Sequence, residues 1–152
     1  RCHLEDATPV AQIRGTGPFA DHPVVDVNPA ANPPADADLD KVCLLRCGVG
    51  TGWGSAVYAA DVSPGDVVIV IGVGGVGIHA VQGASHAGAT AVIAVDPVEL
   101  KRQKALEVGA THAFDNIAEA ADFARSITDW QGADSAIDTE GRLGGQGGEH
   151  EG

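Results

Sequence analysis

A cluster of glycines after an apolar run is the part of this sequence best suited to binding a ligand. Residues 67–71 are a short, β-branched run without charge, which predicts a strand buried on both faces. Gly72, Gly74 and Gly77 then form the pattern G-x-G-x-x-G where this strand would turn into a helix. Such a turn brings backbone N–H groups and a helix N-terminus close to a pyrophosphate. The pattern alone is weak evidence, and its surroundings decide what it means.

An acidic residue stands where a dinucleotide site needs one. Asp96 ends the next apolar run, 19 residues after Gly77. A carboxylate at this position accepts hydrogen bonds from an adenosine ribose and repels a 2′-phosphate, so the sequence favours NAD over NADP. Lys101 follows one helical turn later and would reach the same ribose, the alternative being a solvated surface lysine. The alternative for the glycines is a turn that binds nothing.

A cysteine is the second chemical signal. Cys47 opens a small-residue stretch, residues 47–52, which we expect to form a flexible turn. A thiolate is a good zinc ligand, but zinc takes three or four ligands. Taken alone, Cys47 is better explained as a buried structural cysteine. Cys43 lies four residues earlier and could form a metal site with Cys47, but the apolar neighbours of Cys43 predict that its side chain faces the core. The histidines of the sequence show no spacing typical of metal ligands.

Alternating strands and helices must hold these residues. We expect strands at residues 67–71, 91–96, 112–114 and 133–138 and helices at residues 75–87, 98–108 and 117–128. Gly88 and Gly109 would end the first two helices. This alternation predicts an α/β fold with a parallel sheet and right-handed crossovers. Upstream, Asp38 or Asp40 would cap a short helix after a Pro/Ala/Asp connector, and residues 24–27 could form a strand.

Composition excludes several classes of function. The formal net charge of -12 argues against a nucleic-acid or anionic-membrane surface. The sequence contains neither an apolar span of bilayer length nor a signal-peptide pattern. Its three cysteines form no disulfide framework, so a reducing cytosol is the default compartment. The 152 residues suit one domain, or one domain and a piece of another, and the start at Arg1 indicates a fragment or processed product.

Taken jointly, these segments resemble zinc-dependent medium-chain alcohol dehydrogenases, most closely the class III-like enzymes of actinobacteria. Residues 40–57 are similar to the family segment that carries a catalytic-zinc cysteine and leads into the Rossmann domain. Gly72–Gly77, Asp96 and Lys101 follow it at matching spacing. Residues 17–22 and 138–142 resemble two further family segments, the second of which passes the nicotinamide side of the cofactor. The likeness covers roughly residues 13–142.

The resemblance implies an α/β fold with an incomplete Rossmann-type doubly wound parallel sheet, preceded by part of a GroES-like catalytic domain. Residues 1–60 would be the C-terminal part of that catalytic domain and a connector, residues 61–142 a partial NAD-binding domain, and residues 143–152 a disordered tail. Cys47 would be a zinc ligand and Thr51 a catalytic residue near the nicotinamide. The implied cofactor-binding residues are Gly72, Gly74, Gly75, Val76, Gly77, Asp96 and Lys101.

The implied reaction is oxidation of an alcohol to an aldehyde or ketone with hydride transfer to NAD, zinc polarising the alcohol oxygen. The implied partners are a small alcohol or aldehyde, with no nucleic acid and no membrane. The full-length protein would be a cytoplasmic homo-oligomer.

The sequence also departs from the family. The second cysteine and the histidine of the family's zinc site, its structural-zinc lobe and its proton-relay residue are missing, and Arg46 replaces a small residue. One alternative is therefore a truncated, non-catalytic NAD-binding remnant. Another is a zinc-free, quinone reductase-type member of the superfamily, against which Cys47 and Asp96 argue. We expect the 152-residue chain to show no alcohol oxidation by itself.

Overall fold

The computed structural model describes residues 2–3, 9–10, 27–28 and 32–140, in two units. In the first unit, residues 1–37, β1 (Cys2–His3) pairs antiparallel with β2 (Pro9–Val10). The second unit, residues 38–152, contains all the predicted site residues. Of the predicted strand at 24–27 only Val27 is described, and it lies in a bend. The segment 17–22 and the predicted tail lie outside the described residues.

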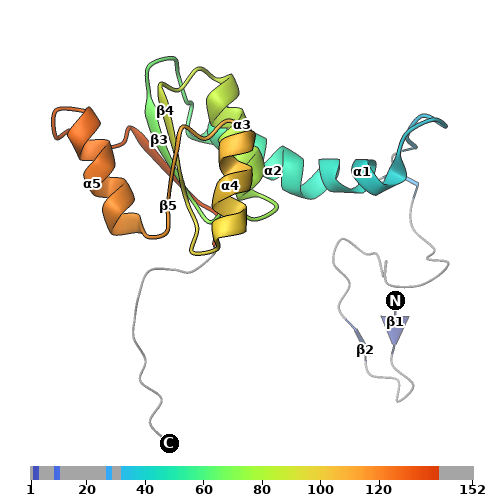
Figure 1. The fold of residues 1–152 in the computed structure, drawn as a ribbon. Helices are drawn as coiled ribbons and strands as arrows, with labels where there is room; N and C mark the ends of the chain where they lie inside the picture. Colours follow the sequence, from blue (N-terminus) through green and yellow to red (C-terminus); the bar gives the residue numbers. More distant parts are fainter. Residues whose placement is uncertain (1, 4–8, 11–26, 29–31, 141–152) are drawn as a thin grey trace, which may run out of the picture. The chain divides into compact units, whose positions relative to one another are not determined.

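The second unit contains a four-stranded parallel sheet with helices on both faces (Figure 1). Its strands are β3 (Val67–Ile71), β4 (Ala91–Val95), β5 (His112–Phe114) and β6 (Ser135–Asp138), in the spatial order β5-β4-β3-β6. The main covering helices are α3 (Gly77–His86), α4 (Glu99–Glu107) and α5 (Ile117–Ile127). All neighbouring strands run parallel. The predicted α/β class and doubly wound parallel sheet are confirmed.

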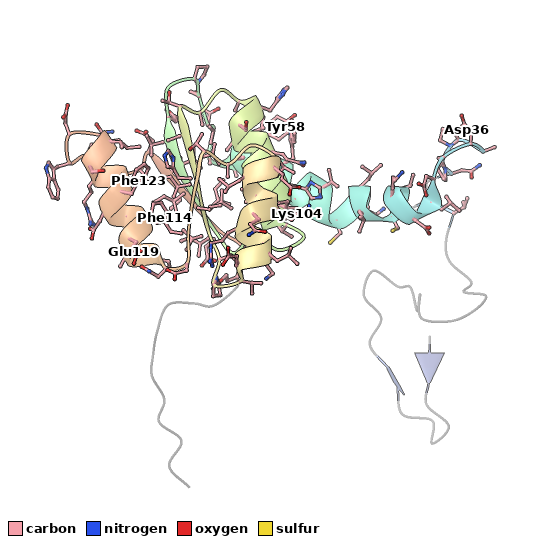
Figure 2. The ribbon with its side chains drawn as sticks, in the orientation of Figure 1. Asp36, Tyr58, Lys104, Phe114, Glu119 and Phe123 are labelled. Carbon is pink, nitrogen blue, oxygen red and sulfur yellow. The ribbon has the colours of Figure 1, made fainter. Side chains whose placement is uncertain are left out.

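Two apolar clusters, one on each face of the sheet, form the core. Val68 and Val70 pack with residues of α3 and α4, whereas Val67 and Ile69 pack with residues of α5. The alternation follows from the period of two along a strand. Phe114 and Phe123 close the α5 side with ring centroids 5.4 Å apart (Figure 2). Because both faces are covered, the central strands are continuously apolar, as the sequence predicts.

A helical segment precedes the sheet. It consists of α1 (Leu39–Leu44), the π-helical η2 (Leu45–Val49), α2 (Gly50–Gly54) and the π-helical η3 (Ser55–Ala59). Asp38 caps it by accepting a hydrogen bond from the Asp40 N–H at 3.2 Å, one of the two predicted caps. Residues 47–52 are therefore helical, and the predicted flexible turn is wrong.

Close packing against α3 explains why this glycine-rich segment is helical. A Cβ on Gly52 would collide with the Val76 carbonyl oxygen and lie 2.8 Å from the His79 Cβ. A Cβ on Gly48 would lie 3.1 Å from the Gly75 carbonyl oxygen. Glycine is a poor helix former, but only glycine allows two backbones to approach so closely. Tertiary contact thus outweighs local propensity here.

None of the helices in the described part of the chain has the length and apolar character needed to cross a bilayer.

Candidate functional site

The glycine turn lies at the carboxyl end of β3, where the winding of the sheet reverses. From β3 the chain adds β4 and β5 on one side, then crosses over through α5 to place β6 on the other side. In open α/β sheets, ligands bind in the crevice outside the carboxyl ends of the strands at this switch point. The fold therefore puts the predicted turn at the position where a nucleotide is expected.

The turn is open at its tip and closed at its base. An added Cβ on Gly74 or Gly75 would meet no atom within 4 Å, and both residues are exposed. A Cβ on Gly77 would instead collide with the Gly72 carbonyl oxygen. No side chain caps the N-terminus of α3. The Ile78 N–H already donates to the Gly74 carbonyl oxygen, and the His79 and Ala80 N–H groups donate to that of Val76, so the backbone N–H groups available to a ligand are those of the turn before them. This geometry fits a pyrophosphate, which needs close backbone approach and exposed N–H groups.

Asp96 is buried directly beneath the turn. It is 2% exposed, although most aspartates in proteins lie at the surface. Its Oδ2 accepts a hydrogen bond from the Val73 N–H at 2.9 Å, and its Oδ1 accepts one from the Val98 N–H at 2.9 Å. The Lys101 Nζ lies 3.3 Å from Oδ2. The structure thus brings Asp96, Lys101 and the glycine turn together, as predicted.

The hydrogen bonds keep Asp96 ionised despite its burial. Burial by itself raises the pKa of the Asp96 carboxyl, because a charge is less stable away from water. The N–H groups of Val98 and Val73 and the Lys101 ammonium lower it by more, so the pKa of Asp96 lies below its ordinary value of 3.8. The residue is therefore a fixed negative charge at neutral pH.

This pKa shift predicts a pH dependence of stability. Because the folded pKa lies below the ordinary value of 3.8, Asp96 stabilises the fold fully above that pH and loses the contribution as the pH falls through the folded pKa. We expect the difference in unfolding free energy between the parent and Asp96→Asn to shrink as the pH is lowered from 6 to about 3. Urea unfolding at each pH measures it. A difference that does not change with pH would contradict the assignment.

Lys101 is the exposed member of this group. Its side chain is 47% exposed, in contrast to the carboxylate that it faces, which is 2% exposed. Because its ammonium is half in solvent, the pair contributes little to stability.

Cys47 and Thr51 lie on the helical segment that packs across the start of α3. Both side chains are exposed, and the backbone at Gly48 approaches that of Gly75 in the turn. Cys43 is also exposed, and its thiol donates a hydrogen bond to the Asp40 carbonyl oxygen at 3.2 Å. The prediction that Cys43 faces the core is wrong, because the apolar residues around it are also mostly exposed in this segment.

The described residues do not provide a zinc site. No group of three or more His, Cys, Asp or Glu side chains that could hold a metal occurs in the described part of the chain. Zinc takes three or four protein ligands, and Cys47 supplies one thiolate. The donor set within the described ranges therefore does not fit the metal.

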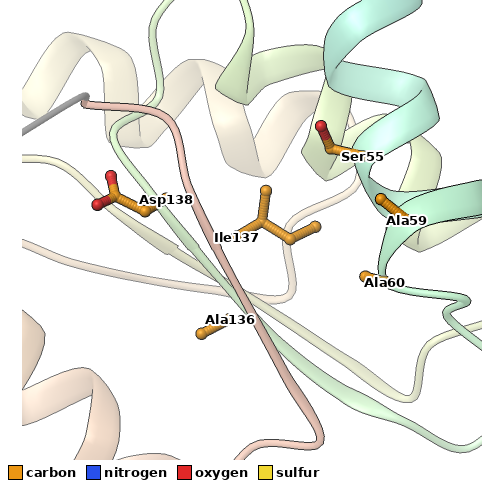
Figure 3. Close-up of a pocket in the computed structure, with 6 residues that line it drawn as sticks. All are labelled: Ser55, Ala59, Ala60, Ala136, Ile137 and Asp138. Atoms are coloured by element: carbon orange, nitrogen blue, oxygen red, sulfur yellow. The ribbon is translucent and has the colours of Figure 1, made fainter.

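A pocket of about 300 Å³ lies between η3 and β6 (Figure 3). It is lined by Ser55, Ala59, Ala60, Ala136, Ile137 and Asp138. None of these residues belongs to the glycine turn, but Asp138 pairs with Ile71, the residue directly before it.

One residue of the site was not predicted. Thr139, just after β6, donates a hydrogen bond from its hydroxyl to the Gly72 carbonyl oxygen at 2.6 Å. Threonine after a strand carries no signal of such a role, because its partner lies 67 positions earlier in the sequence. Only the pairing of β3 with β6 brings the two together.

Comparison with known proteins agrees with this geometry. Residues 75–143 match the model of the zinc-binding dehydrogenase family. Over 105 residues the chain is 56% identical to the NDMA-dependent alcohol dehydrogenase of Amycolatopsis methanolica, covering 69% of this chain and 28% of the relative. The chain belongs to the zinc-binding dehydrogenase family. The predicted resemblance is thereby confirmed.

Other members of the zinc-binding dehydrogenase family extend the comparison. Alcohol dehydrogenase B of Mycobacterium tuberculosis is 44% identical over 129 residues, covering 85% of this chain and 34% of that protein. The crystal structure of benzyl alcohol dehydrogenase from Acinetobacter calcoaceticus superposes with a TM-score of 0.63 at 32% identity, over 70% of this chain and 30% of that one. The chain thus spans about a third of the length of the family members it matches.

Proposed function

We propose that this chain is the NAD-binding part of a zinc-dependent alcohol dehydrogenase, which oxidises an alcohol to an aldehyde or ketone with hydride transfer to NAD. The observation that carries the proposal is the glycine turn at the switch point, with the buried carboxylate of Asp96 bonded to it. The alcohol dehydrogenases among its relatives support the reaction class. In this proposal residues 61–142 form part of the NAD-binding domain, and residues 1–60 form the C-terminal part of the catalytic domain and a connector.

Each site residue has a role that its surroundings allow. The N–H groups of the turn and of the start of α3 bind the pyrophosphate, through Gly72, Gly74, Gly75, Val76 and Gly77. Asp96 holds the adenosine ribose, which Lys101 also reaches. A carboxylate offers about four acceptor positions, and Val73, Val98 and Lys101 occupy three, so the ribose uses the remaining one or displaces the lysine.

Cys47 and Thr51 belong to the catalytic part of the proposal. Cys47 would supply one thiolate to zinc and Thr51 would lie near the nicotinamide. NAD, when bound, supplies the hydride acceptor. Because the described residues do not complete a zinc site, no catalytic step is assigned to the metal in this chain. The alcohol or aldehyde substrate and the homo-oligomer likewise remain part of the proposal for the whole protein.

Titration of the purified chain with NAD and NADP tests the nucleotide site. We expect NAD to bind at least about tenfold more tightly, because a 2′-phosphate would approach the buried charge of Asp96. Isothermal titration calorimetry measures both affinities. Equal affinities would contradict the ribose assignment, and the absence of NAD binding would contradict the proposed function.

The same preparation tests the catalytic assignment. Incubated with benzyl alcohol and NAD, the chain is expected to form no NADH, because its described residues hold one zinc ligand. Measurable turnover would show that the chain completes its own site. In a protein of the relatives' length, Cys47→Ser should lose zinc and keep NAD binding, and full zinc occupancy would make Cys47 a structural residue.

A second electron acceptor is favoured by one comparison. The relative from Amycolatopsis methanolica is named as NDMA-dependent. If this chain shares that property, alcohol oxidation by the whole protein would proceed with NDMA rather than with free NAD as the acceptor. Assays with each acceptor in turn distinguish the two. A third possibility, the non-catalytic NAD-binding remnant, predicts NAD binding without turnover with either acceptor.

A further inference from the structure

We propose that Thr139 is a positioning residue for the pyrophosphate-binding turn, which it holds together with Asp96. The two side chains form hydrogen bonds to opposite ends of one peptide unit, the one that joins Gly72 to Val73. The proposal rests on the proposed NAD site and adds to it a residue on β6's side of the crevice.

The carbonyl end of this peptide unit is held by Thr139. The Thr139 N–H donates to the Ile71 carbonyl oxygen at 2.9 Å, which continues the pairing of β6 with β3 and places Thr139 beside the turn. Its Oγ1 lies 2.6 Å from the Gly72 carbonyl oxygen and 3.1 Å from that of Ile71. A hydroxyl has one proton to donate, and the Ile71 oxygen already accepts the N–H. The shorter contact, to Gly72, is therefore the main hydrogen bond.

The N–H end of the same peptide unit is held by Asp96. The Val73 N–H donates to Asp96 Oδ2 at 2.9 Å, and this hydrogen bond is buried. Asp96 follows β4 and Thr139 follows β6, the two strands that flank β3. The peptide plane is thus fixed from both sides. Gly72 has a φ of 79°, a conformation that side chains disfavour, so the turn depends on these contacts and on glycine.

This arrangement keeps the carbonyl oxygen of the peptide unit out of the open space over the turn. The Gly72 carbonyl oxygen lies between the Thr139 hydroxyl and the Cα of Gly77, where an added Cβ would strike it. It is therefore enclosed at the base of the turn, while the space over Gly74 and Gly75 stays open. A carbonyl oxygen turned into that space would repel a phosphate. By fixing the peptide, Thr139 lowers the cost of ordering the turn when the pyrophosphate binds.

Two variants of Thr139 test the proposal. Thr139→Val removes the hydroxyl at nearly constant volume, and Thr139→Ser keeps it. We expect Thr139→Val to weaken binding of ADP-ribose about 3- to 10-fold, as the loss of one hydrogen bond implies, and to change adenosine binding less than twofold. Adenosine reaches Asp96 but has no pyrophosphate, so it reports on the fold of the ribose site. Thr139→Ser should bind both ligands like the parent.

Hydrogen exchange of the ligand-free chain gives a second measurement. The amides of residues 72–77 should exchange faster in Thr139→Val than in the parent or in Thr139→Ser, while those of β4 should not change. Unchanged ADP-ribose affinity, or an equal loss for ADP-ribose and adenosine, would overturn the proposal. If the parent binds neither ligand, the NAD site itself is wrong, and unchanged exchange at residues 72–77 would then overturn the role of Thr139 as well.

Discussion

Replacing Asp96 with asparagine is expected to lower the free energy of unfolding by about 2–4 kcal/mol and to remove most of the discrimination between NAD and NADP. The carboxylate accepts two backbone N–H groups, one on each oxygen, while nine-tenths or more of it is buried. Asparagine keeps one acceptor and turns an NH₂ group toward the other N–H. One buried donor is then left unpaired, and the charge that would repel a 2′-phosphate is gone.

Urea unfolding at pH 7 and calorimetric titration with both nucleotides measure the two effects. Lys101→Met is the matched control, because it removes the exposed ammonium and leaves the carboxylate and its backbone hydrogen bonds in place. It should change stability by less than about 1 kcal/mol and keep the preference for NAD. Alanine or glycine at position 96 should also relax the preference for NAD over NADP. Each of them, however, leaves the N–H groups of both Val73 and Val98 unpaired. If the Asp96→Asn protein were as stable as the parent and as selective for NAD over NADP, the carboxylate would neither stabilise the turn nor bind the ribose.

Two alanine substitutions in the glycine turn are expected to have very different effects on stability. Gly77→Ala places a Cβ against the Gly72 carbonyl oxygen and 2.9 Å from the Thr139 Oγ1. The first obstacle is backbone, so we expect a loss of about 3 kcal/mol or more and no detectable NAD binding. Gly74→Ala meets no atom within 4 Å and should unfold within about 0.5 kcal/mol of the parent. Its methyl group, however, enters the space assigned to the pyrophosphate.

The informative result is therefore the NAD affinity of a fully folded Gly74→Ala protein. We expect it to fall at least about tenfold, because the nucleotide phosphates must approach the backbone closely at this point. Circular dichroism and urea unfolding verify the fold, and calorimetry measures the affinity. If Gly74→Ala binds NAD like the parent, the open space over the turn is not the pyrophosphate site. If Gly77→Ala is fully stable, the packing at the base of the turn is looser than the structure shows.

The sequence predicted the sheet well because its signals are local and strong. The β-branched run of residues 67–71 forms a strand with those bounds, and residues 112–114 do so too. The three predicted helices occur with ends that differ from the prediction by at most two residues. Gly88 and Gly109 take positive φ values of 92° and 130° after α3 and α4, as expected for helix ends. Asp96 could be predicted as a candidate because the distance from the glycine turn to an acid after the next strand is set by the βαβ unit itself, and its role at the ribose stays a prediction.

Two of the failures, at residues 47–52 and at Thr139, share a physical cause, which is dependence on contacts distant in sequence. Residues 47–52 look flexible because glycine favours turns, yet packing against Val76 and His79 makes them helical. Thr139 contacts the turn only through the pairing of β6 with β3. Cys43 was assigned to the core from its neighbours, although a helix turns adjacent residues toward different faces.

The glycines of the helical segment also have a consequence for the order of folding. Every second position in the centre of this segment is a glycine, at Gly48, Gly50, Gly52 and Gly54. Each glycine costs about 1 kcal/mol of helix stability relative to alanine. Such a segment is a weak helix former by itself, and most of the stability of a helix in a protein comes from tertiary packing. It becomes helical only as it docks on α3. We therefore expect Cys47 to reach its position only when this segment packs against α3.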